Sequence, residues 1–305
     1  MATQYESVHQ APKGPGDARP TALQIIKDNQ LHGQWSDKTI LITGCSSGIG
    51  IETAKALADT GATLYLTARD LAKAKSALGS LLNNDRVHLL ELDLNSLASV
   101  RRCADDFLTK SPGLNVLIAN AGVMATPEGR TVDGFEVQFG TNHLAHFLLI
   151  QLLLPTLLKS SSANFNSRVV ILSSSAHRHG GINFDNLNFD GDYNPWIAYS
   201  QSKTANLYTA TEIERRYGDQ GVHAWSVHPR LIGTGLMKFL PDETLAHPEQ
   251  GAATTVWAAA AKALQGQGGR YLKDCQISKP AKDKPEEYKP RYAAWAYDKK
   301  KERML

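Results

Sequence analysis

Cysteine is scarce in this chain, whose 305 residues include three. Cys45, Cys103 and Cys275 lie far apart and form no C-x-x-C pair. Isolated cysteines in a small, odd number argue against a disulfide framework and against a thiolate zinc site. The closely spaced histidines in "HLAH" and "HRH" have no acidic or thiolate partner at a ligand-like spacing. We therefore expect no metal.

Long apolar runs and targeting signals are also lacking. The longest apolar stretch, "HLAHFLLIQLLLPTLL" (143–158), contains two His and a Pro and is shorter than the roughly 20 residues that span a bilayer. The first 20 residues show no basic segment followed by an apolar one, as a secretory signal would. The sequence predicts a soluble, cytoplasmic protein with no transmembrane segment.

A large excess of one charge is absent, because the formal net charge is +3. Residues 273–305 hold ten Lys or Arg and six Asp or Glu, so they carry 10 − 6 = +4 and the remainder carries 3 − 4 = −1. A near-neutral body gives little support for nucleic-acid binding. We expect no nucleic-acid partner, a solvated basic tail over 276–305, and a partly disordered, Gly- and Pro-containing extension over 1–36.

Apolar residues make up 42% of the chain, which is enough for a substantial core. Short apolar runs alternate with helical patterns, as in β-α-β units. The sequence predicts an α/β fold: a single Rossmann-like domain over 37–275, with a doubly wound parallel sheet of about seven strands and helices on both faces. Loops 176–197 and 231–250 interrupt it. The expected strands are 39–43, 63–68, 87–92, 115–120, 168–172, 222–227 and 269–272; the expected helices are 50–61, 71–82, 96–109, 133–159 and 197–217.

The first expected strand leads into "LITGCSSGIG" (41–50), with glycines at positions 44, 48 and 50. The spacing G-x3-G-x-G differs from G-x-G-x-x-G and from the phosphate-binding loop that ends in GK[ST]. Gly44, Gly48 and Gly50 could let a pyrophosphate approach the N-terminus of the next helix. Alternatively, they form a tight turn that only packs helix against strand.

Polar or small residues follow the other expected strands at 93, 120–122, 173–175 and 228–234. The carboxyl ends of parallel strands lie at one edge of a sheet, so these segments should form one cleft with the glycine loop. Together, "TGCSSGIG", "LDL" (92–94), "NAG" (120–122), "SS" (173–174), "YSQSK" (199–203) and "HP" (228–229) resemble the ordered motifs of the short-chain dehydrogenase/reductase family over roughly 36–275. The segments "LTARD", "GTNHLAHFLL" and "IAYSQSKTANLY" most resemble its retinol-dehydrogenase and WW-domain-oxidoreductase branch.

Arg69 follows the second expected strand, which ends at Ala68. An NAD enzyme usually has an acid there, whereas a guanidinium suits the 2′-phosphate of NADP. Ser46 and Ser47 could add hydroxyl donors. The alternative is that Arg69 pairs with the neighbouring Asp70 at the surface. We expect NADP(H) as the cofactor.

The resemblance implies further cofactor contacts. Asp93 would bind the adenine and Asn120 would lie beside the adenine ribose, although Asp93 could instead cap the next helix. The other positions carried over from the family's cofactor site are Ile49, Leu94, Ala121, Gly122, Pro229, Ile232 and Thr234.

Tyr199 and Lys203 are four residues apart on an expected helix, so both project from one face. A nearby ammonium and an oxidised nicotinamide favour the phenolate, which would let Tyr199 act as general acid and base. The alternative is an ordinary surface pair. The resemblance implies that Lys203 also holds the cofactor ribose and that Ser174, or secondarily Ser173, binds the substrate oxygen. It also implies that Asn142 anchors a water linked to Lys203; the alternative for Asn142 is a structural hydrogen bond.

One position departs from the family pattern. "HPRLIGT" (228–234) has Arg230 where the family usually has glycine. Arg230 could be a tolerated change, contact a polar or anionic substrate, or impair cofactor docking. Two groups of apolar residues could meet a substrate or could simply pack: Met237, Phe239 and Leu240 in the second loop, and Phe184, Phe189, Tyr193 and Trp196 in the first.

The sequence therefore predicts an NADP(H)-dependent oxidoreductase acting on the alcohol or carbonyl of a hydrophobic small molecule. Two alternatives remain: a redox-neutral cyclase or isomerase of a biosynthetic pathway, and a non-enzymatic nucleotide-sensing scaffold. By analogy with the family, a homodimer through the two long helices is possible.

Overall fold

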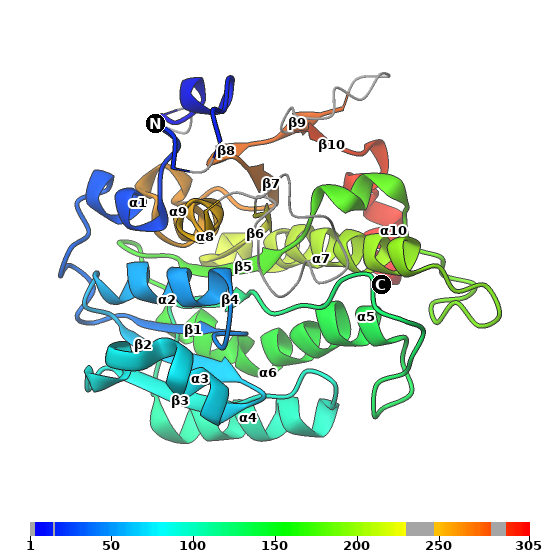
Figure 1. Ribbon diagram of the computed structural model, residues 1–305, viewed down its shortest axis with the longest axis horizontal. Helices are drawn as coiled ribbons and strands as arrows, with labels where there is room; N and C mark the ends of the chain where they lie inside the picture. Colours follow the sequence, from blue (N-terminus) through cyan, green and yellow to red (C-terminus); the bar gives the residue numbers. More distant parts are fainter. Residues whose placement is uncertain (1–3, 15, 230–246, 282–290) are drawn as a thin grey trace.

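The computed structural model describes residues 4–14, 16–229, 247–281 and 291–305 (Figure 1). Its centre is an eight-stranded sheet in the order β3-β2-β1-β4-β5-β6-β7-β8, in which all neighbours are parallel except β7 and β8. The expected doubly wound fold is confirmed, with one more strand than the approximate count. The strands are β1 Thr39–Ile42, β2 Thr63–Ala68, β3 Val87–Glu91, β4 Val116–Ala119, β5 Ser167–Leu172, β6 Val222–His228, β7 Arg270–Lys273 and β8 Gln276–Ile277. Two more, β9 Lys279–Pro280 and β10 Arg291–Tyr292, pair with each other.

Helices cover both faces of the sheet (Figure 1). One face carries α1 Ala22–Asp28, α2 Ile49–Ala58, α3 Leu71–Leu78, α8 Pro248–Gly251 and α9 Ala253–Ala260. The other carries α4 Leu97–Lys110, α5 Val137–Phe139, α6 Ala145–Ser160 and α7 Pro195–Tyr217, with α10 Lys299–Met304 against α7. A π-helix, η3 Gly140–Leu144, joins α5 to α6. The described 3-10 helices are η1 Ser7–His9, η2 Gly79–Asn83, η4 Ser175–His179, η5 Gly218–Gln220, η8 Lys262–Leu264 and η9 Ala294–Tyr297.

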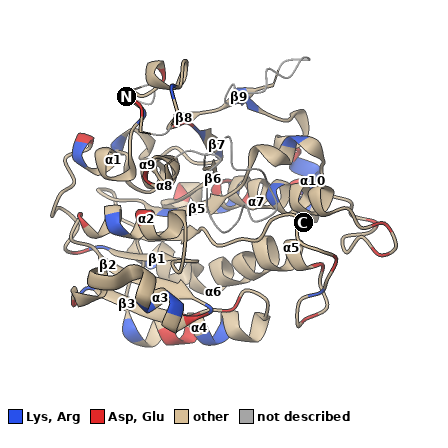
Figure 2. Ribbon diagram, in the orientation of Figure 1, with Lys and Arg blue, Asp and Glu red and all other residues tan. Residues whose placement is uncertain are grey.

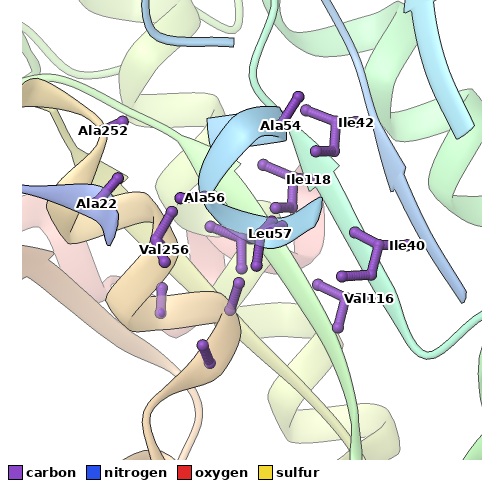
Figure 3. Close-up of a cluster of buried hydrophobic side chains, with 14 of the residues drawn as sticks. Ala22, Ile40, Ile42, Ala54, Ala56, Leu57, Val116, Ile118, Ala252 and Val256 are labelled. Carbon is purple, nitrogen blue, oxygen red and sulfur yellow. The ribbon is translucent and has the colours of Figure 1, made fainter. Parts of the chain in front are cut away.

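The core beneath α2 explains why β1 and β4 consist almost entirely of apolar residues. Ile40 and Ile42 of β1 lie beside Val116 and Ile118 of β4, and Leu57 of α2 packs above them (Figure 3). These strands are covered on both faces, so each residue along them meets apolar neighbours. The sheet edge that carries the glycine loop is therefore fixed by a buried core.

The described part of the N-terminal segment is packed onto the fold. Tyr5 is buried and its hydroxyl donates to Asp28 Oδ2 at 2.8 Å. Trp35 meets the Phe165 ring edge-on at 5.3 Å. The Gln250 side-chain amide donates to the backbone oxygen of Arg19 at 3.0 Å. Over these residues the structure differs from the partly disordered extension expected from composition.

The end of the chain is docked as well, which differs from the expected solvated tail. The Trp295 indole donates to the backbone oxygen of His177 at 3.1 Å, and Tyr208 on α7 donates to the backbone oxygen of Trp295 at 2.8 Å. Lys and Arg residues are spread over several elements, including α10 (Figure 2). Within 291–305, composition described the surface charge but missed the buried Ala293 and Ala296 and the half-buried aromatic residues beside them.

One helical run is long and apolar enough to cross a membrane by length and composition: Val137–Ser160, which joins α5, η3 and α6. Half of its most apolar window is buried inside the protein. Leu149, Leu153 and Leu157 are fully buried in the cluster between α6 and the sheet. This burial is typical of a core helix. The run is longer than the stretch read from the sequence because 137–142 continue the helix.

Candidate active site

A cleft of about 630 Å³ lies at the carboxyl ends of β1, β2, β4, β5 and β6. This is the edge at which doubly wound sheets bind ligands, and the volume lies within the roughly 300–1,000 Å³ common for such sites. The predicted residues that line it are Gly44, Ser46, Ser47, Gly48, Ile49, Arg69, Asp93, Leu94, Asn120, Ala121, Gly122, Ser174, Tyr199, Lys203 and Pro229. Gly50 and Asn142 lie behind this lining. Arg230, Ile232, Thr234 and the second-loop residues Met237, Phe239 and Leu240 fall outside the described residues.

The glycine loop combines close packing with open amides. A Cβ on Gly44, whose φ is +76°, would lie 2.7 Å from that of Ala121, and a Cβ on Gly50 would lie 2.2 Å from the Gly44 oxygen. Both glycines therefore allow the loop to press against β4 and α2. Gly48 precedes α2 with φ +64° and provides no side-chain cap. The first amides of this ten-residue helix can thus bind a phosphate. Close packing therefore explains Gly44 and Gly50, and a pyrophosphate contact beside Gly48 stays a prediction.

Thr43 and Asn120 join the loop to β4. The Thr43 hydroxyl oxygen accepts from the backbone amides of Asn120 and Ala121 at 2.9 and 3.0 Å. The Asn120 side-chain amide donates to the Thr43 backbone oxygen at 2.8 Å. Within the described residues, the buried Asn120 Oδ1 has no hydrogen-bond donor. A sugar hydroxyl would satisfy this acceptor, so the site fits a nucleotide.

Two cations line the cleft beside β2. Arg69 is exposed there, and Lys73 follows one turn into α3. Asp70 caps α3, accepting from the Lys73 amide at 2.9 Å, and the described residues contain no ion pair between Asp70 and Arg69. Lys73 was not predicted, although its position four residues after Arg69 in "ARDLAK" indicates a second cation on the same side of the helix start.

Asp93 is not the cap of the following helix. Its Oδ1 accepts from the Asn95 amide at 3.0 Å, inside the turn, while Ser96 caps α4 through the Ser99 amide. Asp93 remains in the cleft lining. The structure therefore contradicts the capping alternative and leaves the adenine contact as a prediction.

The structure distinguishes the two candidate serines. The Ser173 hydroxyl donates to the backbone oxygen of Lys203 at 2.7 Å, so its proton is already used to join β5 to α7. Ser174 Oγ accepts from the Ala176 amide at 3.1 Å, and its hydrogen bond with Tyr199 lowers the pKa of that phenol, so its proton is directed to the site and not to the backbone. Geometry therefore favours Ser174 for binding a substrate oxygen.

Tyr199 and Lys203 lie one turn apart on α7, which begins behind the cap formed by Asn194. Both are 5% exposed. Lys203 Nζ lies 5.6 Å from the centre of the Tyr199 ring and donates to the Leu172 oxygen at 3.0 Å. Burial raises the pKa of Tyr199 to about 12, although a hydrogen bond with Ser174 acts in the opposite direction. Burial lowers the pKa of Lys203 to about 8. At neutral pH the phenol is a proton donor beside an ammonium.

Asn142 is held within the structure. It lies in η3, where Oδ1 accepts from the Val123 amide at 2.8 Å and Nδ2 donates to Ser202 Oγ at 3.0 Å. Its backbone oxygen accepts from Asn206 Nδ2 at 3.0 Å and lies 3.0 Å from His146 Nδ1. These bonds agree with the structural alternative, and the water-anchoring role stays a prediction.

The loop aromatics mostly pack. Phe189 is buried, Phe184 lies against the cluster around Phe139, and Trp196 is 44% exposed. The Tyr193 hydroxyl donates to the backbone oxygen of Thr126 at 2.9 Å. None of these four rings lines the cleft. The cleft is lined instead by Val123, Met124, Thr126 and Pro127, which the sequence did not single out.

Potential metal ligands are not gathered: within the described ranges, no group of three or more His, Cys, Asp or Glu could hold an ion. The buried histidines have other partners. His146 Nε2 lies 2.9 Å from the Thr43 hydroxyl, and His143 Nδ1 lies 3.2 Å from Asn206 Oδ1.

Comparison with known proteins identifies the family. A family model described as short chain dehydrogenase matches residues 38–244. The short-chain dehydrogenase/reductase prx1 of Penicillium roqueforti is 51% identical over 280 residues, which cover 88% of this chain and 82% of that protein. The chain belongs to the short-chain dehydrogenase/reductase family.

Two further relatives of this short-chain dehydrogenase/reductase bear on its branch and fold. Human retinol dehydrogenase 11 is 38% identical over 257 residues, covering 80% of each chain. A short-chain dehydrogenase of Shigella flexneri, solved in complex with NADP, is 25% identical with a TM-score of 0.64 over 80% of this chain and 99% of that one. The expected family and its retinol-dehydrogenase-like branch are confirmed.

Proposed function

We propose that this oxidoreductase transfers hydride between NADP(H) and the alcohol or carbonyl carbon of a hydrophobic small molecule, with Tyr199 as acid and base. The observation that carries the proposal is the buried Tyr199 beside Ser174 and Lys203 in the lining of the cleft. A buried phenol with a hydroxyl and an ammonium as neighbours is suited to moving one proton at a substrate oxygen.

The cofactor would lie along the strand ends. The amides at the start of α2 would hold its pyrophosphate, and Asn120 would meet its adenine ribose. Arg69 and Lys73 would hold the 2′-phosphate, because two cations suit a dianion and Asp70, which also lines the cleft, already accepts from the Lys73 amide. The relative from Shigella flexneri, solved with NADP, supports this choice. When bound, the nicotinamide supplies or accepts the hydride.

The protein's own residues handle the proton and the charge. In the reductive direction Tyr199 gives its proton to the carbonyl oxygen, and the Ser174 hydroxyl donates a hydrogen bond as that oxygen gains charge. Lys203 holds a positive charge beside the ring, which favours the phenolate left behind. Because burial keeps the phenol protonated at neutral pH, the resting site is ready for carbonyl reduction.

The substrate side supports an apolar ligand. Met124 is 8% exposed and packs against Tyr199, with Val123 and Pro127 also in the lining. These side chains can bury hydrocarbon next to the reacting carbon. The Thr126 hydroxyl is the one neutral donor of this wall, within the described residues.

The test is turnover by the full chain and by Tyr199→Phe with NADPH and a panel of apolar aldehydes and ketones. Phenylalanine keeps the ring but removes the proton, so kcat should fall about 10²- to 10⁴-fold while NADPH binding stays unchanged. Equal turnover by the variant would refute the role of Tyr199. Product formation without net loss of NADPH would support the redox-neutral alternative instead.

A further inference from the structure

His177 lies directly between the site serine and the end of the chain. It is fully buried in η4, the turn that follows Ser174. One ring nitrogen, Nδ1, lies 2.6 Å from the backbone oxygen of Ser174. The other, Nε2, lies 3.1 Å from the backbone amide of Ala293, 116 residues further along the chain. A single imidazole thus connects the catalytic turn to the C-terminal segment.

The two partners fix the state of the ring. The Ala293 amide can only donate, so Nε2 accepts and Nδ1 must carry the proton. The Ser174 carbonyl can only accept, so it receives that proton in a hydrogen bond. Burial, the main cause, lowers the pKa of His177 to about 4, so the ring is neutral at physiological pH. The bond from Ala293 therefore selects the tautomer that holds Ser174.

The C-terminal segment, residues 291–305, is itself anchored by polar contacts around His177. Trp295 donates to the His177 backbone oxygen at 3.1 Å. Tyr297 accepts through its hydroxyl from the Tyr271 amide at 2.9 Å, and the Tyr271 ring lies edge-on to His177 at 4.7 Å. None of these C-terminal residues lines the cleft. The segment supports the catalytic turn from behind.

We propose that residues 291–297 act through His177 as a positioning element that holds Ser174 in register with Tyr199. His177 is a positioning residue, because it contacts the Ser174 backbone and lies outside the cleft lining. The inference rests on the proposed function in assigning Ser174 the substrate oxygen. Ser174 is then correctly aligned with Tyr199 only when residues 291–297 are docked.

The sharpest test removes one hydrogen bond far from the cleft. Ala293 has φ −68°, which proline adopts, so Ala293→Pro deletes the amide proton with little backbone change. The proline ring also occupies the space of that proton and displaces the His177 imidazole. The control Ala293→Gly keeps the amide. We expect about a tenfold to hundredfold lower kcat for Ala293→Pro, with unchanged NADPH binding. The kinetic pKa of Tyr199 should also rise, because a displaced Ser174 no longer opposes the effect of burial.

Variants at His177 separate its two bonds. In His177→Asn the side-chain amide lies near the former Nδ1 and can still donate to Ser174. In His177→Gln it lies near the former Nε2 and can still accept from Ala293. Relative to His177→Phe, we expect His177→Asn to keep a higher kcat than His177→Gln. We expect His177→Gln to protect residues 291–305 from proteolysis better than His177→Asn. His177→Phe should lose both properties.

A measurement independent of turnover keeps the proposal separate from the proposed function. Imidazole ¹⁵N spectra of the wild-type chain should show His177 with its proton on Nδ1, and Ala293→Pro should change that pattern. A proton on Nε2 in the wild type overturns the inference even if the enzyme reduces carbonyls. A folded Ala293→Pro with wild-type kcat and pH profile overturns it as well. Absence of turnover in the wild type, with the expected spectrum, counts only against the proposed function.

Discussion

Glu302 on α10 makes the docking of the C-terminal segment sensitive to pH. The residue is 3% exposed, and its carboxylate oxygens have no hydrogen-bond donor within the described residues. Burial is the main cause that raises its pKa to about 7, and Glu212 on α7 and Asp298 add to the effect. Arg215 and Lys299 act in the opposite direction. The folded state therefore prefers the protonated acid.

The sign follows from linkage. An acid whose pKa is higher in the folded than in the unfolded state stabilises the fold fully when the pH lies below the unfolded pKa of 4.5. That contribution to the free energy of unfolding is lost as the pH rises to the folded pKa of about 7. At 1.36 kcal/mol per pH unit, the loss is on the order of 3 kcal/mol. We expect residues 291–305 to exchange amide hydrogens faster, relative to the intrinsic rate, at pH 8 than at pH 5.

Glu302→Gln removes the charge and keeps the shape, so this pH dependence should disappear in the variant. The exposed Glu249→Gln is a matched control, since it also removes one carboxylate. Hydrogen exchange followed by peptide mass spectrometry measures both variants between pH 5 and 8. If Glu302→Gln keeps the wild-type pH dependence over 291–305, the burial argument is wrong.

Two further predictions concern the cleft. Arg69→Asp combined with Lys73→Met should lower kcat/KM for NADPH by about 10- to 100-fold and raise it for NADH, because charge-assisted bonds to a phosphate are worth about 1.5–3 kcal/mol; equal use of both cofactors by the unaltered protein would contradict this. Ser174→Ala should lower kcat about 10²- to 10³-fold with a small change in stability. Ser173→Ala, which loses a bond to α7, should mainly lower the melting temperature, and a larger kcat loss in Ser173→Ala than in Ser174→Ala would reverse the assignment.

Most of the fold could be predicted from local sequence patterns. The strands are short apolar runs. Ser96 is the N-cap of α4 and Asn194 is the N-cap of α7, so the first residues of these helices follow from the cap and from the apolar periodicity. The site residues were also predictable because the ends of parallel strands meet at one edge of the sheet. Arg230 and the second loop lie outside the described residues, so their alternatives stay open.

Other features depend on contacts between distant segments, which no local pattern reveals. The choice between Ser173 and Ser174 needed the backbone oxygen of Lys203. His146 is one of two closely spaced histidines in the sequence, and the structure places it between the Thr43 hydroxyl and the Asn142 backbone oxygen. The chain end has a charged composition typical of a free tail, and its docking depends on the buried Ala293 and on the hydrogen bond donated by the half-buried Trp295.

The bonds that align the site run behind the cleft, from Thr43 through α6 and α7 to Leu172. The side chains of Met124 and Pro127, which also line the cleft, take part in none of the hydrogen bonds within the described residues. In the proposed mechanism, the residues that move the proton and those that meet the substrate are therefore largely different ones. For new substrate ranges by laboratory evolution, Pro127 is the first position to diversify, because Met124 also packs against Tyr199.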